Sequence, residues 1–370
     1  MNILICPDKF KGSLPADKVC EYLGMGISEV YEKAQLTYHP LADGGDGTIS
    51  ILKNPLNLSS KTVDTIDPLG RPIQSEYYIY DKTAFVELAS ASGLALLDKY
   101  ERNPLITSTR GTGIMMREAI ENGAEKIYLF IGGSATNDAG IGIAHALGFD
   151  FLDAQGDQLD PVGHNLSNIH SIDTKNSIEL SQVEIKVLCD VTNPMHGPDG
   201  AAYTYAPQKG AEQWVVKKLD QGLQSYDSLL KTQFNKDISE MPGIGAAGAV
   251  GASLIGLFNA ELQKGFEMVS ELTRLEEAIK NSDLVITGEG KIDSTSIKGK
   301  VVGNVLSLCQ QYSKPCAVVS GGLDVNDQFL SKFAFHHSII SLAIDESDAM
   351  SHPMKYLIEI GKKIGTHLAS

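Results

Sequence analysis

The chain begins with the apolar stretch Asn2-Ile-Leu-Ile-Cys6, which Pro7 separates from the loop Asp8-Lys-Phe-Lys-Gly-Ser13. A short continuous apolar run is typical of a strand that is covered on both faces, as in a parallel sheet. Ser13 is a favourable N-cap residue, and apolar side chains follow it at helical spacing: Val19, Tyr22, Leu23 and Ile27. This stretch therefore predicts a strand, a loop and a helix, the first unit of an α/β fold.

The same alternation returns towards the end of the chain. Short apolar runs predict strands at 283–287, 316–320 and 338–342, and a helical face separates the first two. A further strand is expected near 36–40. Strands that alternate with helices indicate a parallel sheet, so we expect both chain ends to form one Rossmann-like domain.

The middle of the chain has a different pattern. Residues 61–88 predict strands joined by tight turns, which is typical of an antiparallel or mixed sheet. Beyond them we expect a helix at 113–121, a strand at 126–131, a helix at 141–147 and a strand at 183–189. The uncharged stretch 242–260 is interpreted as a loop that enters a buried helix.

These patterns predict an α/β protein with two domains. The 370 residues exceed the length of about 250–300 residues at which one hydrophobic core usually stops growing. Residues 1–60 and 280–370 are expected to form a discontinuous Rossmann-like parallel-sheet domain. Residues 61–279 are expected to form an inserted mixed-sheet α/β domain, with the active site in the cleft between the two.

Composition excludes several classes of partner. The chain has 31 basic and 46 acidic residues, a net charge of −15, so its average surface repels nucleic acids and anionic membranes. The five cysteines are odd in number and contain no Cys-x-x-Cys pair, which favours reduced thiols in the cytoplasm and gives no zinc signature. The N-terminal apolar run is too short for a signal peptide.

Polar residues and glycines follow the predicted strands. Ligands of open α/β sheets collect beyond the carboxyl ends of the strands, so these segments are the candidate binding loops. They are Asp8-Lys-Phe-Lys-Gly-Ser13, Asp43-Gly-Gly-Asp46-Gly47, Gly132-Gly-Ser-Ala-Thr-Asn-Asp138, Asp190-Val-Thr-Asn193, Gly288-Glu-Gly-Lys-Ile-Asp293 and Gly321-Gly322. Such a set suits an anionic substrate together with a metal ion.

Each loop has a physical rationale. Residues 132–136 are expected to open a helix, whose free N–H groups favour a phosphate or a carboxylate. Asp43 and Asp46 suit a hard cation such as Mg²⁺. Lys9 and Lys11 either meet phosphate as mobile charges or belong to a solvated loop.

Of two familiar phosphate-binding motifs, one is absent from the sequence and the other lacks the strand that should precede it. The sequence contains no Gly-x-x-x-x-Gly-Lys-Ser/Thr motif. Gly243-Ile-Gly245-Ala-Ala-Gly248 matches the dinucleotide fingerprint, but Glu240-Met-Pro precedes it instead of a strand.

The chain resembles the class I glycerate kinase family over nearly its whole length. The resemblance rests on seven ordered blocks: Pro7-Asp-Lys-Phe-Lys-Gly-Ser-Leu14, Pro40-Leu-Ala-Asp-Gly-Gly-Asp-Gly-Thr48, Gly132-Gly-Ser-Ala-Thr-Asn-Asp138, Cys189-Asp-Val-Thr-Asn-Pro194, Pro207-Gln-Lys-Gly-Ala211, Gly243-Ile-Gly-Ala-Ala-Gly248 and Gly288-Glu-Gly-Lys-Ile-Asp293. The departures are small: Thr295-Ser296 stands where the family tends to have Gln-Thr, and Ala249 where a glycine is common.

The resemblance implies a cytoplasmic enzyme that phosphorylates D-glycerate with ATP and Mg²⁺. It implies two α/β domains with the active site in the cleft between them, and it favours 2-phosphoglycerate as product. The choice of hydroxyl does not follow from the residues themselves, and a homo-oligomer stays open.

Roles can then be assigned as hypotheses for phosphoryl transfer, which needs positioning and charge neutralisation more than covalent chemistry. Asp190 would accept the hydroxyl proton, Asn193 would orient it, and Lys9 and Lys11 would neutralise the migrating phosphoryl group. The proposed phosphate-binding residues are Ser13, Gly132, Gly133, Ser134, Thr136, Gly288, Glu289, Gly290 and Lys300. The proposed metal ligands are Asp43, Asp46 and Asp293, with Glu289 as a further candidate. The proposed glycerate-binding residues are Asn137, Asp138, Arg71, Arg110 and Lys209, of which the last three could supply a cation for the carboxylate.

Two other functions stay open from the residues alone. One is a NAD(P)-dependent oxidoreductase that acts on a small hydroxy acid through the Gly243 motif. The other is a non-catalytic regulator that binds a metabolite.

Overall fold

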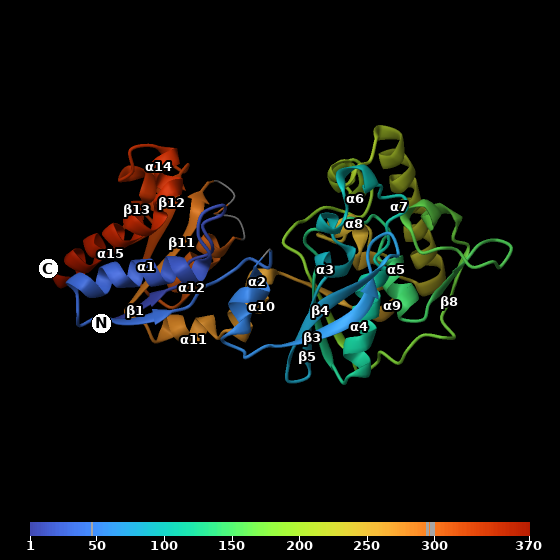
Figure 1. Ribbon diagram of the computed structural model, residues 1–370, viewed down its shortest axis with the longest axis horizontal. Coiled ribbons are helices and arrows are strands. Elements are labelled where there is room, and N and C mark those ends of the chain that lie inside the picture. Colours follow the sequence, from blue (N-terminus) through green and yellow to red (C-terminus); the bar gives the residue numbers. More distant parts are fainter. Residues whose placement is uncertain (46, 294–295, 297–299) are drawn as a thin grey trace. The chain divides into compact units, whose positions relative to one another are not determined.

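The computed structural model describes residues 1–45, 47–293, 296 and 300–370. The chain divides into two compact units: Met1–Leu56 with Lys264–Ser370 form unit 1, and Asn57–Gln263 form unit 2. Each unit has its own sheet, so each is described by itself (Figure 1).

Unit 1 is built on a parallel five-stranded sheet in the order β13-β12-β11-β1-β2. The strands are β1 (Asn2–Ile5), β2 (Gln35–Tyr38), β11 (Leu284–Ile292), β12 (Cys316–Leu323) and β13 (His336–Ser338). From β1 the chain moves to β2 on one side, whereas β11 leads to β12 and β13 on the other. The boundary between β1 and β11 is therefore a topological switch point, where open α/β sheets bind their ligands.

Helices α1 (Ala16–Val30) and α15 (Pro353–Ala369) lie side by side in unit 1 (Figure 1). Glycines allow this close approach, because a Cβ on Gly26 would lie 2.1 Å from the carbonyl oxygen of Ile358. The apolar faces of both helices are part of the buried core beside the sheet, which includes Leu23 of α1 and Leu357 of α15. The other helices of the unit are α2 (Thr48–Lys53), α10 (Gly265–Leu272), α11 (Leu275–Lys280), α12 (Val301–Gln311), α13 (Asp327–Leu330), the 3₁₀ helix η5 (Ile339–Ser341) and α14 (Glu346–Ser351).

Unit 2 has a mixed six-stranded sheet in the order β10-β9-β6-β5-β4-β3. Strand β4 pairs antiparallel with β3 on one side and with β5 on the other, whereas β5, β6, β9 and β10 run parallel to one another. Their bounds are β3 (Ser59–Ile66), β4 (Pro72–Tyr80), β5 (Thr83–Glu87), β6 (Lys126–Phe130), β9 (Glu184–Leu188) and β10 (Glu261–Gln263), and β7 (Asp150–Leu152) pairs with β8 (Ser171–Asp173) separately.

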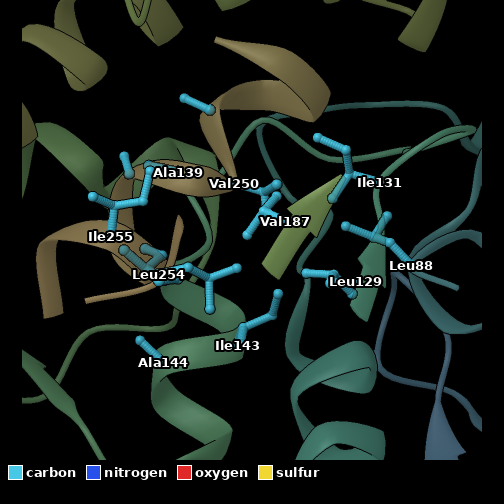
Figure 2. Packing of buried hydrophobic residues seen from close by; sticks show 14 of the residues in the cluster. Leu88, Leu129, Ile131, Ala139, Ile143, Ala144, Val187, Val250, Leu254 and Ile255 are labelled. Atoms are coloured by element: carbon cyan, nitrogen blue, oxygen red, sulfur yellow. The ribbon is translucent and has the colours of Figure 1, made fainter. Parts of the chain in front are cut away.

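The core of unit 2 lies between the sheet and its helices. Figure 2 shows Leu129 of β6 and Val187 of β9 near Ile143 of α5 and Leu254 of α9, all of them buried. The helices are α3 (Ala89–Ser92), α4 (Arg110–Glu121), α5 (Ile141–Ala146), α6 (Ala201–Tyr205), α7 (Gln213–Phe234), α8 (Ala246–Ala249) and α9 (Gly251–Phe258), with 3₁₀ helices η1 (Leu94–Leu96), η2 (Lys99–Glu101), η3 (Gly163–Asn168) and η4 (Pro207–Lys209).

The predicted fold class, a parallel sheet with a separate mixed sheet, is confirmed. The strands expected near 2–6, 36–40, 126–131 and 183–189 are present within a few residues of their predicted bounds. Among the described residues, no helix is both long and apolar enough to cross a bilayer, and the stretch 242–260 contains α8 and α9 as a loop-to-helix segment.

Three local predictions are wrong. Ser13 does not cap α1, because Pro15 restricts the residue before it and the helix begins at Ala16. Residues 132–136 do not open a helix, since α5 begins only at Ile141. The strand expected at 338–342 ends at Ser338, whose carbonyl accepts a bond from the Ser341 hydroxyl as the chain turns into η5.

A fourth prediction misplaces a strand end. The glycines at 288 and 290 suggest a loop after Thr287, but β11 continues to Ile292. A Cβ on Gly288 would lie 2.0 Å from the carbonyl oxygen of Val319, so glycine is needed there for β12 to approach. Glycine in a strand often marks such a close backbone contact.

The contact between α1 and α15 gives a stability prediction. We expect Gly26→Ala to lower the free energy of unfolding by about 1–3 kcal/mol, because the added methyl group must displace the backbone at Ile358. This loss should exceed the gain of about 1 kcal/mol that alanine brings to a helix interior. Urea denaturation followed by circular dichroism measures the change.

The control is Met25→Ala, since Met25 lies on the same helix and is 51% exposed. It should change stability by at most about 0.5 kcal/mol. Equal stability of the Gly26→Ala variant and the wild type would contradict the close packing described here.

Candidate active site

A cavity of about 890 Å³ lies at the switch point of unit 1. It is lined by the loop after β1, the loop after β2 and the end of β11. The charged residues of its lining are Asp8, Lys9, Lys11, Asp43, Glu289, Lys291, Asp293 and Lys300. The structure thus brings together residues that are far apart in the sequence.

The loop after β1 is held by a tight turn. The amide of Phe10 donates to the carbonyl of Leu14, the amide of Leu14 donates back to Phe10, and Gly12 has a left-handed φ of 75°. The Phe10 ring is buried and anchors the turn in the core. Its neighbours Lys9 and Lys11 both line the cavity, as does Ser13, which is half-buried.

Asp8, Asp43 and Glu289 are three of the four carboxylates that line the same cavity. Asp8 and Glu289 are each only 8% exposed, and Asp43 contributes a third. Burial, followed by the charge of Asp43, raises the pKa of Asp8 from 3.8 to about 7. Burial also raises the pKa of Glu289, and its Oε1 has no hydrogen-bond partner among the described residues. Buried like charges of this kind favour the arrival of a cation.

The other predicted metal ligands are placed differently. The Asp43 carboxylate accepts a bond from the amide of Gly45 at 3.0 Å, which shapes the loop after β2. Asp293 lines the cavity, and its carboxylate accepts a bond from the amide of Ser296. Asp46 lies outside the described residues.

The donor set fits Mg²⁺ held partly by a phosphate. Within the part of the chain that the structure describes, no group of three or more His, Cys, Asp or Glu side chains is arranged to hold a metal ion by itself. Mg²⁺ is usually bound through one or two carboxylates plus substrate phosphates, which does not need such a cage. Asp43 and the unpartnered oxygen of Glu289 can supply these one or two carboxylate ligands.

In unit 2, the loop after β6 carries the segment 132–138. Gly132 and Gly133 are exposed, whereas Ser134 to Asp138 are buried. The Lys209 ammonium is 1% exposed and donates to the Ser134 hydroxyl and to the Thr136 carbonyl, both at 2.7 Å. Burial lowers the pKa of Lys209 to about 7.

The carboxylate of Asp138, which is predicted to contact glycerate, is hydrogen-bonded to its own chain through both oxygens. One carboxylate oxygen accepts bonds from the amide and hydroxyl of Thr109, and the other accepts from the amide of Gly140. These bonds tie together the starts of α4 and α5. The neighbouring Asn137 is buried, and its side-chain amide has no partner among the described residues.

The Gly243-Ile-Gly-Ala-Ala-Gly248 motif supports these loops by packing. A Cβ on Gly245 would lie 2.0 Å from the carbonyl oxygen of Pro194, and one on Gly248 would lie 2.3 Å from that of Thr136. Ala247 and Ala249 flank Gly248 with left-handed φ angles of 54° and 62°. The motif therefore places backbone against two candidate loops, and no strand precedes it.

The loop after β9 holds Asp190 and Asn193. Asp190 is exposed at the carboxyl end of this parallel strand. The Asn193 amide donates to the Asp199 carbonyl and to the Thr204 hydroxyl, and its oxygen accepts from Tyr205. These bonds show that the Asn193 side chain holds the loop after β9 in place.

The candidate cations for the glycerate carboxylate differ in their surroundings. Arg71 is already paired with the carboxylates of Asp67 and Glu101. Arg110 is exposed at the first residue of α4. Lys209 is buried, as described above.

Two residues were not identified from the sequence. The sequence predicts Asp8 only as part of a binding loop, although its place shortly after β1 is a signal. Arg102 has no feature in the sequence that marks it as a site residue. In the structure its Nε is buried without a partner among the described residues. A Cβ on Gly210 would lie 3.0 Å from the Arg102 Cβ. Arg102 therefore lies against Gly210, the residue after Lys209.

Comparison with known proteins identifies the family. The family model described as "Glycerate kinase family" matches residues 3–369. The chain belongs to the glycerate kinase family. It is 40% identical over 326 residues to the glycerate 2-kinase of Escherichia coli K12, covering 87% of this chain and 86% of that protein.

Other relatives agree. The glycerate kinase of Bacillus subtilis 168 is 36% identical and covers 100% of this chain, which in turn covers 98% of that protein. The crystal structure of a protein provisionally named glycerate kinase 2, from Salmonella typhimurium LT2, superposes with a TM-score of 0.88 at 35% identity, covering 100% of this chain and 98% of that one. The fold, the family and the kinase class of this enzyme are thus shown.

The charge on Asp8 gives a pH-dependent prediction. Because folding raises its pKa from 3.8 to about 7, the folded chain binds this proton more tightly than the unfolded chain. Stability from this group is therefore lost as pH rises from about 4 to about 7. In metal-free buffer we expect Asp8→Asn to raise the free energy of unfolding by about 1–3 kcal/mol at pH 8 and hardly at all near pH 4.

Urea titrations at the two pH values, with EDTA present, measure this difference. Asp17→Asn is the control, since Asp17 is exposed on α1 and should change stability little at either pH. A variant at Asp8 that is less stable than the wild type at pH 8 would show that its charge is instead compensated in the folded protein.

Proposed function

We propose that this protein transfers the γ-phosphoryl group of ATP to the 2-hydroxyl of D-glycerate, releasing ADP and 2-phosphoglycerate. The observation that carries the proposal is the switch-point cavity of a glycerate kinase family member, in which lysines and buried carboxylates gather. The 2-position is favoured by the 40% identity to a relative named glycerate 2-kinase.

Unit 1 would hold the phosphates. Lys9, Lys11 and Lys300 line the cavity as cations, and the backbone of Gly290 lies against the loop after β1. Asp43 and Glu289 would hold Mg²⁺, with Asp8 and Asp293 beside them. When bound, Mg²⁺ neutralises charge on the phosphate oxygens.

Unit 2 would bind and activate glycerate. Asp190 would accept the hydroxyl proton while the oxygen attacks the γ-phosphorus, and the bond from that phosphorus to the bridging oxygen breaks with its electron pair leaving on ADP. Arg102 and Lys209 are the preferred partners of the carboxylate, because Arg71 is already paired with two carboxylates. Asp138 and Asn193 would support the loops without touching substrate.

The alternatives are not favoured. An oxidoreductase would need the Gly243 motif to bind a dinucleotide, but that segment packs against Pro194 and Thr136. A non-catalytic regulator would not explain the membership in a kinase family.

A direct assay tests the proposal. The protein is incubated with ATP, Mg²⁺ and D-glycerate, ADP is followed by a coupled reaction, and ³¹P NMR identifies the product. L-glycerate and NAD(P)⁺ serve as controls. Failure to form ADP across a panel of hydroxy acids would reject the kinase proposal, and 3-phosphoglycerate as product would reject the proposed regiochemistry.

The proton acceptor can be tested separately. We expect Asp190→Asn to lower kcat by about 10²–10⁴-fold, the usual contribution of a general base, with folding unchanged. Asp199→Asn is a matched control, because Asp199 is an exposed carboxylate in the same loop. A loss of less than tenfold at Asp190 would remove it from this role.

The metal assignment has its own test. We expect Glu289→Gln to raise the Mg²⁺ concentration for half-maximal activity by about tenfold or more, because the buried oxygen loses its charge. Glu277→Gln, on the exposed side of α11, is the control. An unchanged Mg²⁺ dependence would mean that Glu289 does not hold the ion.

A further inference from the structure

A second hollow of about 400 Å³ adjoins the switch-point cavity in unit 1. Its walls come from the ends of β11 and β12, from η5 and from α14. Most of the side chains that line only this hollow are apolar: Leu323, Ile339, Ile340, Ala349 and Met350. The backbone of Gly321 and Gly322 forms another part of its lining. We call it the apolar slot.

The slot and the switch-point cavity share part of their lining. The shared residues are Phe10, Lys11, Ser13, Gly290 and Lys291. The two hollows are therefore neighbours, one apolar and the other charged. A nucleoside triphosphate has the same division, with a flat ring system at one end and an anionic tail at the other.

We propose that the apolar slot binds the adenine ring of ATP. The inference rests on the proposed function and adds the place and direction of the nucleotide. Ligand sites are mostly apolar with a few polar groups that fix orientation, and they lie beyond the carboxyl ends of parallel strands. The slot meets both conditions at the ends of β11 and β12.

The lining also orders the phosphates. Lys11 and Ser13 line both hollows, so they meet the part of the tail nearest the nucleoside. Lys9, Asp43, Glu289 and Lys300 line the switch-point cavity but not the slot, so they meet the terminal phosphates. The reacting γ-phosphorus then lies at the carboxylate end, where the metal ligands are proposed.

Gly322 provides a means to fill the slot. A Cβ built on Gly322 meets no heavy atom within 4 Å, and its φ is outside the left-handed region, so a side chain is sterically allowed. Gly321 differs, because a Cβ there would lie 2.4 Å from the carbonyl oxygen of Gly290. Only Gly322 can therefore carry extra bulk without moving the backbone.

The experiment compares two ligands on full-length protein. Calorimetry measures the affinity of Mg·ATP and of Mg·tripolyphosphate, which has the charged tail without the nucleoside, for the wild type, Gly322→Ala and Gly322→Phe. We expect the wild type to bind ATP at least about tenfold more tightly than tripolyphosphate. In Gly322→Phe this preference should disappear while tripolyphosphate affinity and thermal stability stay the same, and Gly322→Ala should lie between the two.

The control is Ile344→Phe, since Ile344 is 90% exposed and does not line the slot. Retention of the full ATP preference and ATP KM by a folded Gly322→Phe variant would overturn the slot assignment, even when the wild type phosphorylates glycerate. A wild type that binds neither ligand and forms no ADP would instead overturn the proposed function itself. The two failures are thus distinguishable.

Discussion

The chain leaves β1 and β11 in opposite directions across the sheet, and the candidate site of unit 1 depends on this divergence. Adjacent parallel strands that are joined by one crossover have a helix and its loops over their ends. At a switch point no single crossover spans the two strands, so a crevice forms at their carboxyl ends. Asp8 follows the end of β1, and Glu289 lies on β11 beyond the part that pairs with β1. This explains why two buried carboxylates from distant segments line one cavity.

Much of the fold could be predicted from the sequence because the strands are short apolar runs with clear breakers between them. The candidate loops can also be predicted, because ligands of open α/β sheets bind beyond the carboxyl ends of the strands. This rule selects the loops without any information on how far apart they lie in space. One error comes from interpreting glycine as a turn, since a loop is expected after Thr287 where β11 in fact continues. Gly288 and Gly290 lie inside β11, and Gly245 and Gly248 bring backbone segments together, which requires knowledge of what packs opposite them.

The site was less predictable than the fold for a similar reason. Asp138 and Asn193 have the residue types expected of ligand contacts, yet their side chains are used by Thr109, Gly140 and the 193–205 loop. Nothing in a sequence tells which polar group is already satisfied by its own chain. Arg102 shows the converse, because its unpartnered nitrogen becomes visible only when burial is known.

The left-handed segment at Ala247, Gly248 and Ala249 bears on how this chain differs from its relatives. Ala249, with a φ of 62°, stands where the resembled family commonly has glycine. A left-handed alanine is less favourable than glycine by about 1–2 kcal/mol, so the substitution leaves a strain that the surrounding packing must absorb. The chain therefore retains an unused margin of stability at this position, because a glycine at 249 would adopt the same backbone conformation without that strain.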